Sequence, residues 1–417
     1  MNLAEELSAR GLIEHSSAKP EDILAAPRTT YLGIDPTADS LHIGHLEPIL
    51  FMRRLGAAGF PLIFLVGGAT GQIGDPKETG ERSLLDEKTA RTNTRAIKRQ
   101  LKGLLGKTPF KLVDNADWLT KERLVPFLRE VGKHFTVNEL VKRELIKKRL
   151  TTPDESISYT EFSYALLQAY DFLTLYEKYG CDLQVGASDQ WTNILSGLEL
   201  IRKKKGKEAY ALTVPLFTDA SGKKFGKSEG NAIWLDPGKT SPFAFYQFWM
   251  NLPDKNVEKY LKAYTLLSLA EITTLMELHN REPAEREAQK TLARLVTEIV
   301  HGSVRAENIA KAANTLFGDT PPAEWPADDW KAVLTEVPSV AYSKDTLEEG
   351  LAFSEALVAG GIASSKSDGR RLIGGKGIMV NGKTVENPDA KLSLSDLPNG
   401  RAVVRKGRQG VLVIVLK

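Results

Sequence analysis

The sequence predicts an α/β protein whose first part contains a parallel β-sheet, followed by an α-helical region and a small α+β module. Residues 61–66 are almost wholly apolar, which is typical of a strand buried on both faces of a parallel sheet. Residues 29–34 form a second apolar strand, and an apolar-periodic helix running to about residue 55 connects the two. This strand, helix, strand order predicts a βαβ unit.

Length and composition narrow the class of protein. A chain of 417 residues is too long to fold around one ordinary hydrophobic core, so two or three domains are expected. With 42% apolar and 26% charged residues, the composition is that of a soluble globular protein. The single cysteine, Cys181, cannot form an internal disulfide. Because no apolar run reaches roughly 18–20 residues and no signal-peptide pattern opens the chain, we expect a cytoplasmic protein without membrane attachment.

The first chemical motif lies at residues 31–45. The strand ends in a Gly/Pro/Asp turn, and His42 and His45 flank Gly44 where the next helix begins. A helix N-terminus favours anions, and two histidines on one helix face can add hydrogen-bond donors. Phosphate binding is therefore one interpretation; two surface histidines or half of a metal site are the others. The lack of a nearby His/Cys cluster in the sequence disfavours a metal.

A glycine-rich loop follows the apolar strand at residues 67–76, where the carboxyl ends of parallel strands bind ligands. Charged amphipathic helices are predicted at 89–105 and 137–150, with a strand at 110–113 between them. The lysines and arginines of these helices are expected mainly to form a solvated face.

The helix predicted at 160–176 is apolar around much of its circumference, so it should be largely buried. Its polar residues form one stripe at spacings of 3, 4 and 3: Glu161, Tyr164, Gln168 and Asp171. Buried polar groups need partners. Spacing alone leaves open whether a neighbouring helix or a polar ligand provides them.

Two further loops follow strands predicted at 181–185 and 211–217. In the first, Asp189 is placed to cap a helix that begins near Trp191, and it also lies at the ligand-binding end of the sheet. The second loop combines glycine, Lys224, Lys227 and Ser228. Such a loop is suited to closing on a polyphosphate.

The C-terminal part differs in composition. Residues 241–316 are predicted to be helical, and residues 320–330 to form a linker. Residues 351–417 hold eleven Lys/Arg and five Asp/Glu, which predicts a polyanionic partner. In this segment we expect a helix near residue 351, a hairpin at Asn381-Gly382 and a closing strand at 411–416.

Together these motifs resemble the bacterial tyrosyl-tRNA synthetases over essentially the whole chain. The class I signature His-Ile-Gly-His is complete at 42–45, and Lys-Phe-Gly-Lys-Ser stands at 224–228. The basic tail resembles an S4-type RNA-binding domain. The resemblance implies a Rossmann-like catalytic domain at 1–235, an α-helical anticodon-side domain at 236–318, a linker at 319–349 and an S4-like domain at 350–417. It also implies a homodimer formed through the region 115–180.

The implied reaction joins L-tyrosine to ATP, releases pyrophosphate, and transfers the tyrosyl group to the 3′ end of tRNA. Magnesium would accompany ATP rather than occupy a dedicated protein metal site. The residues that this resemblance places on the reacting phosphates are Thr37, His42, His45, Arg82, Lys224, Lys227 and Ser228. Those placed on ATP more broadly are Gly33, Asp35, His42, Gly44, His45, Asp189 and Lys227.

For tyrosine, the resemblance places Tyr31 and Asp171 on the phenolic hydroxyl. The residues placed on the ammonium and carboxylate groups are Asp75, Tyr164, Gln168 and Gln190. For RNA it implies Lys366, Arg370 and Arg371, which fall on or beside one helical face. The chain departs from the family pattern at Ala187 and Thr192, where glycines are usual, and in a loop at 76–82 that is one residue shorter.

Three other functions compete with this interpretation. A tryptophanyl-tRNA synthetase or a small-molecule adenylyltransferase could share the histidine motif, but Tyr31 with Asp171 and the Phe-Gly form of the lysine motif argue against both. An RNA-binding protein without catalysis is the third, and the intact histidines and lysines argue against it. Amino-acid-dependent ATP–pyrophosphate exchange separates these possibilities.

Overall fold

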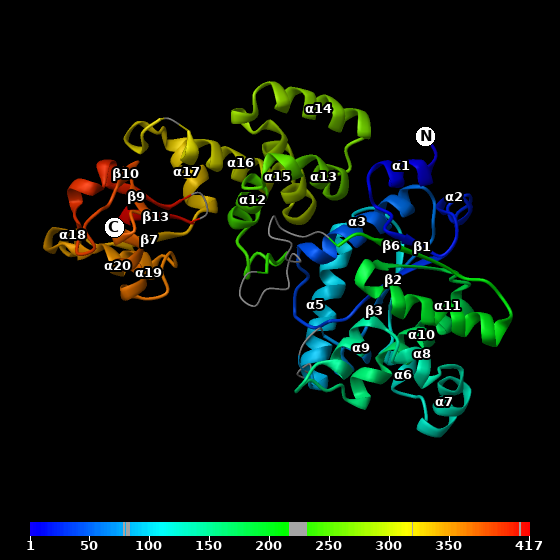
Figure 1. The fold of residues 1–417 in the computed structure, drawn as a ribbon. Helices are drawn as coiled ribbons and strands as arrows, with labels where there is room; N and C mark the ends of the chain where they lie inside the picture. Colours follow the sequence, from blue (N-terminus) through cyan, green and yellow to red (C-terminus); the bar gives the residue numbers. More distant parts are fainter. Residues whose placement is uncertain (78–79, 81–83, 217–231, 319, 408–409) are drawn as a thin grey trace. The chain divides into compact units, whose positions relative to one another are not determined.

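The structure is a computed structural model of residues 1–417, and it describes all of them except 78–79, 81–83, 217–231, 319 and 408–409 (Figure 1). The chain divides into two compact units, which are described separately below. The first comprises residues 1–236 and 262–269, and the second residues 237–261 and 270–417. Within the described ranges, no helix is both long and apolar enough to cross a membrane.

A six-stranded sheet with the order β1-β6-β5-β2-β3-β4 forms the centre of the first unit. Its strands are β1 (His15–Ser16), β2 (Thr30–Ile34), β3 (Leu62–Val66), β4 (Phe110–Asp114), β5 (Leu183–Ala187) and β6 (Tyr210–Val214). In this order every neighbouring pair of strands between β6 and β4 is parallel, whereas the short β1 pairs antiparallel with β6. The predicted parallel sheet is confirmed. β5 begins two residues later than expected, so Cys181 precedes it.

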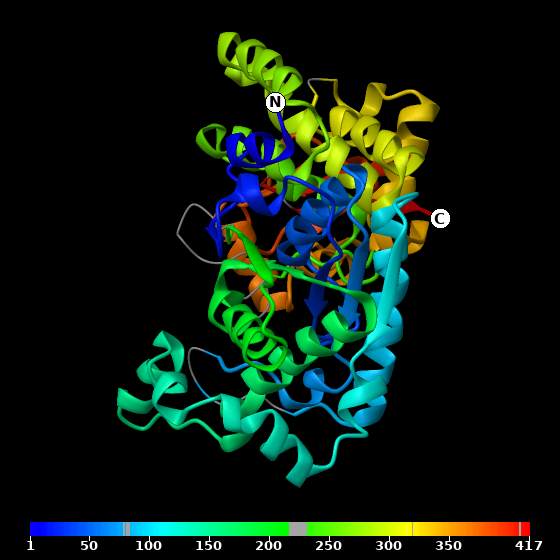
Figure 2. The same cartoon turned by 90° about the vertical axis from the view of Figure 1, so that its right-hand side faces the viewer.

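Helices cover both faces of this sheet. The described helices of this unit are α1 (Leu3–Ala9), α2 (Pro20–Ile23), α3 (Ile43–Ala57), α4 (Thr70–Ile73), α5 (Glu87–Leu105), α6 (Ala116–Leu119), α7 (Leu124–Glu130), η1 (Gly132–His134), α8 (Val137–Leu140), α9 (Glu144–Thr151), α10 (Tyr159–Tyr179), η2 (Ser188–Gln190) and α11 (Trp191–Lys205). In Figure 2 the long cyan helix α5 and the green helices α10 and α11 flank the strands. α10 packs along α11, and α5 packs against α3 and β3.

The single helix expected at 137–150 is wrong, because the chain forms α8 and α9 with a turn between them. Arg143 lies in this turn. Its guanidinium donates to Oδ1 of Asn193 at 3.1 Å and to Oγ of Ser196 on α11. The interruption therefore lets Arg143 turn toward α11.

The second unit opens with helices: α12 (Pro242–Met250), α13 (Asp254–Tyr264, whose last residues belong to the first unit), α14 (Leu269–Arg281), η3 (Pro283–Glu285), α15 (Glu287–His301) and α16 (Ser303–Phe317). This confirms the helical prediction for 241–316. Residues 320–330, which we expected to form a linker, instead contain η4 (Pro322–Glu324) and the start of α17 (Ala327–Glu336). The buried rings of Trp325 and Trp330 lie 4.8 Å apart, so this segment gains apolar burial that an extended linker would lack.

The C-terminal part of this unit holds a five-stranded sheet with the order β10-β9-β12-β13-β7. Its elements are β7 (Ser339–Tyr342), α18 (Lys344–Glu349), β8 (Leu351–Ala352), α19 (Phe353–Ala359), α20 (Lys366–Gly374), β9 (Ile378–Val380), β10 (Lys383–Thr384), β11 (Lys391–Leu392), η5 (Leu394–Asp396), η6 (Pro398–Gly400), β12 (Arg401–Lys406) and β13 (Gly410–Leu416). Asn381 and Gly382 both have positive φ between β9 and β10, which confirms the predicted hairpin. The closing strand is confirmed as β13, and the helix expected near residue 351 begins at Phe353.

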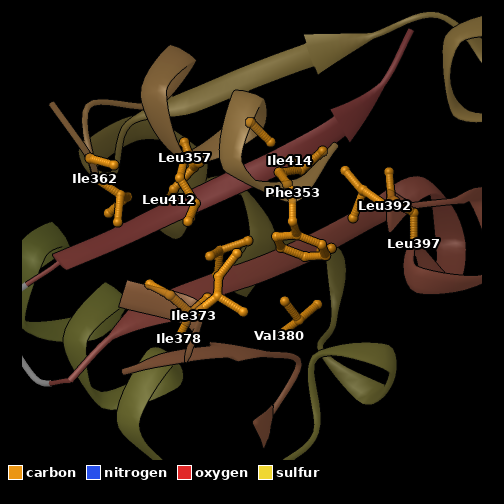
Figure 3. Close-up of a cluster of buried hydrophobic side chains, with 14 of the residues drawn as sticks. Phe353, Leu357, Ile362, Ile373, Ile378, Val380, Leu392, Leu397, Leu412 and Ile414 are labelled. Atoms are coloured by element: carbon orange, nitrogen blue, oxygen red, sulfur yellow. The ribbon is translucent and has the colours of Figure 1, made fainter. Parts of the chain in front are cut away.

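An apolar cluster joins α19 and α20 to this sheet. Figure 3 shows Phe353 and Leu357 of α19 beside Leu412 and Ile414 of β13, with Ile373 of α20 nearby. Strand β7 pairs in parallel with β13, so residues 339–342, expected to belong to a linker, form an edge of the sheet.

Candidate active site

The predicted site residues that the structure describes in the first unit gather near the carboxyl ends of β2 and β5. These two strands are neighbours although they are far apart in the sequence, so the chain order reverses here. Such a switch point is where open α/β sheets bind ligands. Gly33 and Asp35 lie at the end of β2, and Gln190 follows β5.

His42 and His45 form a defined pair at the start of α3. His42 is the N-cap residue, and its Nδ1 accepts a hydrogen bond from the Gly44 backbone N–H at 3.1 Å. Nδ1 of His45 accepts from the His42 backbone N–H at 3.2 Å, and the ring centroids lie 3.9 Å apart. Because both Nδ1 atoms accept, the neutral rings carry their protons on Nε2. Each ring thus has a donor on the side away from its own backbone.

The segment that follows the lysine motif in the chain pairs with the histidine motif. Ile43 donates its N–H to the carbonyl of Ile233, and Leu235 donates to the carbonyl of Leu41. His42 and Trp234 form the bridge between these two bonds. Lys224, Lys227, Ser228 and Arg82, which were predicted to contact phosphate, lie outside the described residues.

Asp171 is buried on α10 and accepts hydrogen bonds from two neutral donors. Trp118 Nε1 donates to its Oδ1 at 2.8 Å, and Asn115 Nδ2 donates to its Oδ2 at 2.9 Å. Burial raises the pKa of Asp171 to about 8, although these two hydrogen bonds act in the opposite direction. A carboxylate held in this way has little charge compensation before a ligand arrives.

Tyr31 lies on β2, with its ring centroid 5.1 Å from that of Phe172, and its side chain is buried. Its hydroxyl has no hydrogen-bond partner in the part of the chain that the structure describes. Burial, with the nearby charge of Asp171, raises the pKa of Tyr31 well above its usual value. An unpartnered buried hydroxyl costs free energy, so this atom favours a polar ligand.

Asp35 joins three elements of the site. Its Oδ2 accepts from the hydroxyl of Tyr164 at 2.7 Å, and its Oδ1 accepts from the hydroxyl of Thr70 at 2.6 Å. Gly67 makes this possible, because a Cβ at that position would lie 1.9 Å from Asp35 Oδ1. Burial and the charges of Asp35, Asp75 and Asp171 raise the pKa of Tyr164 well above its usual value. The hydroxyl therefore lies near three acidic side chains, a setting that favours a cation.

Asp75 is held by α11 and the turn before it. Gln190 Nε2 donates to its Oδ2 and Asn193 Nδ2 to its Oδ1, each at 2.9 Å. Gln168 lies on α10 between Tyr164 and Asp171, and its buried Oε1 has no hydrogen-bond partner from any described residue. The sequence prediction that these residues meet at one site is consistent with this geometry.

Other predicted residues lie at the edge of the site. Gly33 is exposed, and a Cβ at this position would make an ordinary van der Waals contact with Tyr31 Cε2 at 3.9 Å. Thr37 is exposed in the turn after β2, where its N–H donates to the Asp35 carbonyl at 2.9 Å. The capping role considered for Asp189 is wrong: the residue lies inside η2, and Gln190 occupies the N-cap position of α11.

Glu161 is the member of the polar stripe that a neighbouring helix satisfies. Arg149 of α9 donates to Glu161 Oε2 at 3.2 Å, and both side chains are buried. Arg149 also donates to the backbone carbonyls of Lys77, Gly80 and Ser156. Arg149 therefore connects Glu161, near the start of α10, to the backbone of Lys77 and Gly80.

The three predicted RNA-binding residues of α20 are exposed, and each is paired with an acidic side chain. Lys366 bonds to Glu355 at 2.5 Å, Arg370 to Asp389 at 2.8 Å and Arg371 to Asp368 at 2.6 Å. Exposed pairs of this kind contribute about 0–1 kcal/mol, so a phosphate group can displace them.

Sequence reasoning missed four polar residues of the site: Thr70, Asn115, Trp118 and Asn193. Asn115 links several of them, because it also donates to Thr70 Oγ1 and accepts from the Ala69 N–H, each at 2.9 Å. Asn115 and Trp118 directly follow β4 at the ligand-binding end of the sheet, a signal that could have identified them. Among the described residues, no group of three or more His, Cys, Asp or Glu side chains is arranged to hold a metal ion.

Comparison with known proteins defines the class. Residues 25–318 match the family described as tRNA synthetases class I (W and Y), and residues 329–414 match the Tyrosine–tRNA ligase SYY-like C-terminal domain. The fold also resembles solved structures. A C-terminally truncated mitochondrial tyrosyl-tRNA synthetase of Aspergillus nidulans aligns with a TM-score of 0.68 and 32% identity, over 76% of this chain and 94% of that one. The structure therefore defines a class I aminoacyl-tRNA synthetase.

Full-length relatives identify the family within that class. The chain is 47% identical over 415 residues to the Tyrosine–tRNA ligase of Roseiflexus castenholzii, covering 98% of this chain and 97% of the relative. It is 43% identical to that of Bacteroides fragilis, covering all of both chains. The chain belongs to the tyrosine–tRNA ligase family, whose members bind tyrosine, ATP and tRNA and attach tyrosine to tRNA in two steps.

Proposed function

We propose that the network around Asp35, Asp75 and Asp171 is the tyrosine site, with the phenolic hydroxyl on Tyr31 and Asp171. The ammonium group lies on Asp75, Tyr164 and Gln168. The observation that carries this proposal is a pair of buried atoms without hydrogen-bond partners among the described residues, Tyr31 Oη and Gln168 Oε1. A bound tyrosine offers a hydroxyl to the first and an ammonium donor to the second, so it satisfies both.

In the first step a tyrosine carboxylate oxygen attacks the α-phosphorus of ATP, and the bond to pyrophosphate breaks. In the second, a ribose hydroxyl of the terminal adenosine of tRNA attacks the tyrosyl carbonyl carbon, and AMP leaves. The protein mainly positions these groups and stabilises developing negative charge. We assign phosphate contacts to Thr37, Arg82, Lys224, Lys227 and Ser228, and to the Nε2–H donors of His42 and His45.

Gly33, Asp35, Gly44 and Asp189 complete the ATP-binding set, and Gln190 lies beside the reacting carboxylate. The exposure of Gly33 and its lack of a side chain support close approach of the nucleotide. Magnesium arrives with ATP through its phosphates. The exposed Lys366, Arg370 and Arg371 contact tRNA, and the reaction takes place in the cytoplasm.

We further assign a homodimer interface to residues 115–180. Of the twelve exposed large apolar side chains in the described part of the chain, six lie between residues 124 and 159. Leu124, Val125 and Tyr159 are each more than 70% exposed. Apolar exposure of this density favours burial against a second copy. Sedimentation of Leu124→Asp/Val125→Asp as a monomer, against a dimeric parent protein, tests this assignment.

Amino-acid-dependent ATP–pyrophosphate exchange tests the tyrosine site. We expect exchange with tyrosine, and Gln168→Met should raise the KM for tyrosine without lowering the melting temperature, because the lost amide oxygen has no partner within the described protein. Exchange that Gln168→Met leaves unchanged would contradict the assignment of the ammonium group.

A further inference from the structure

The outer face of α5 carries a row of basic side chains. Five of them follow one another at spacings of 3, 4, 4 and 3, and all are exposed: Lys88, Arg91, Arg95, Arg99 and Lys102. These spacings keep the residues on one face of a helix. At a rise of about 1.5 Å per residue, this basic row is roughly 21 Å long.

Most of these charges have no acidic partner among the residues that the structure describes. Arg91 pairs with Glu87 one turn earlier, whereas Lys88, Arg95, Arg99 and Lys102 form no ion pair with any described residue. At the start of the row, a surface groove of about 340 Å³ is lined by Glu87, Lys88, Arg91, Thr92 and Arg95. A row of like charges without acidic partners repels itself and attracts a polyanion.

The opposite face of α5 forms hydrogen bonds with the segment between Asp35 and His42. Asn93 Nδ2 donates to the Pro36 carbonyl at 2.9 Å. Gln100 accepts from the Leu41 N–H at 2.7 Å and donates to Ser40 Oγ at 3.0 Å. The same helix thus supports the segment between Asp35 and His42 and presents the basic row on its outer side.

We propose that the basic row of α5 binds phosphates of the acceptor arm of tRNA. The 3′ end of tRNA must reach the site that α5 supports, so the strand leading to that end passes close to it. Lysine and arginine contacts to a phosphate backbone position the nucleic acid without reading its bases. This proposal rests on the tRNA-charging activity of the family, and it adds an RNA contact on the first unit to those assigned to α20.

Neutralising part of the row tests the proposal. In Arg95→Gln/Arg99→Gln/Lys102→Gln, tyrosine-dependent ATP–pyrophosphate exchange and the melting temperature should stay at the parent values, because all three side chains are exposed. The Kd for tRNA should rise by about 10-fold or more, and the slope of log Kd against log salt should fall by about 2 to 3. The matched control, Arg95→Lys/Arg99→Lys/Lys102→Arg, keeps the charges and should bind tRNA as the parent protein does.

Two results would overturn the proposal. The first is a glutamine variant with unchanged Kd and salt slope, which would make the row a solvated face only. The second concerns phosphate ethylation interference. We expect the glutamine variant to lose the interference that the parent protein shows at acceptor-arm phosphates. Loss of interference at another part of tRNA instead would show that the row has a different occupant. Absence of tyrosine-dependent exchange in the parent protein would be distinct, because it contradicts the proposed tyrosine site instead.

Discussion

The hydroxyl of Tyr164 on α10 donates to Oδ2 of Asp35, which follows β2, over 2.7 Å. From Asp35 the hydrogen bonds continue through Thr70 and Asn115 to Asp171. One chain of side chains therefore joins the residue assigned to the tyrosine hydroxyl with the turn that leads to the ATP motif. Because each member holds the next, a change at either end should affect both amino-acid and nucleotide binding.

Removing the Tyr164 hydroxyl should impair both stability and binding. Tyr164→Phe leaves Asp35 Oδ2 without this donor, and we expect the free energy of unfolding to fall by about 1–3 kcal/mol. The KM for tyrosine should rise as well. Tyr170→Phe is a matched control on the same helix, because the Tyr170 hydroxyl bonds to Glu122 at the surface, and it should cost less than about 0.5 kcal/mol. Equal stability of the two variants in urea unfolding would contradict this prediction.

The pKa of Asp171 predicts how tyrosine use depends on pH. With a pKa raised by burial to about 8, the unliganded carboxyl group is mainly protonated at lower pH. If the ionised form accepts the substrate hydroxyl, kcat/KM for tyrosine should rise about tenfold per pH unit below 8 and level off above it. Asp171→Asn should abolish this rise and lower kcat/KM at pH 8. A parent profile without a transition near 8 would show that ionisation of Asp171 does not govern binding.

Arg149 should be a stability determinant. Arg149→Met leaves the buried Glu161 without its guanidinium and releases the carbonyls of Lys77 and Gly80, so we expect a loss of about 3–5 kcal/mol. The double variant Arg149→Met/Glu161→Met should recover part of this loss, because the buried Glu161 carboxylate is removed together with its partner, and only the partly exposed Glu155 then loses its pairing with Arg149. A double variant as unstable as the sum of the two single variants would show that the pair is not coupled.

The position at which the C-terminal module can be removed should lie near residue 318. A cut after 342 would leave β7 without its partner β13 and would expose α17, whereas a cut after 318 removes both. We expect the shorter protein, 1–318, to keep tyrosine activation and to bind tRNA more weakly. The 1–342 protein should aggregate or be cleaved by protease. Unaltered tRNA affinity of 1–318 would argue against RNA binding by the module.

Local sequence signals predicted the elements that have strong periodicity or turn chemistry. The apolar run of β3, the histidine N-terminus of α3 and the Asn381-Gly382 hairpin each follow from short-range rules. The sequence could not show which donors satisfy Asp171, because Asn115 and Trp118 reach it only through the packing of β4 and α10. The pairing of Glu161 with Arg149 was missed for the same reason. Arg149 lies on α9, which is separated from α8 by a turn at Arg143, and the contact of Arg143 with α11 is tertiary.

The most direct test of the tyrosine site is the Tyr31→Phe variant, assayed by ATP–pyrophosphate exchange with tyrosine and with phenylalanine. The Tyr31 hydroxyl has no partner within the described protein, so its removal should leave the melting temperature unchanged or raise it slightly. We expect the ratio of kcat/KM for tyrosine to that for phenylalanine to fall by about 5-fold or more, since one hydrogen bond to the substrate hydroxyl is lost. An unchanged ratio with an unchanged melting temperature would contradict the placement of the tyrosine hydroxyl at Tyr31.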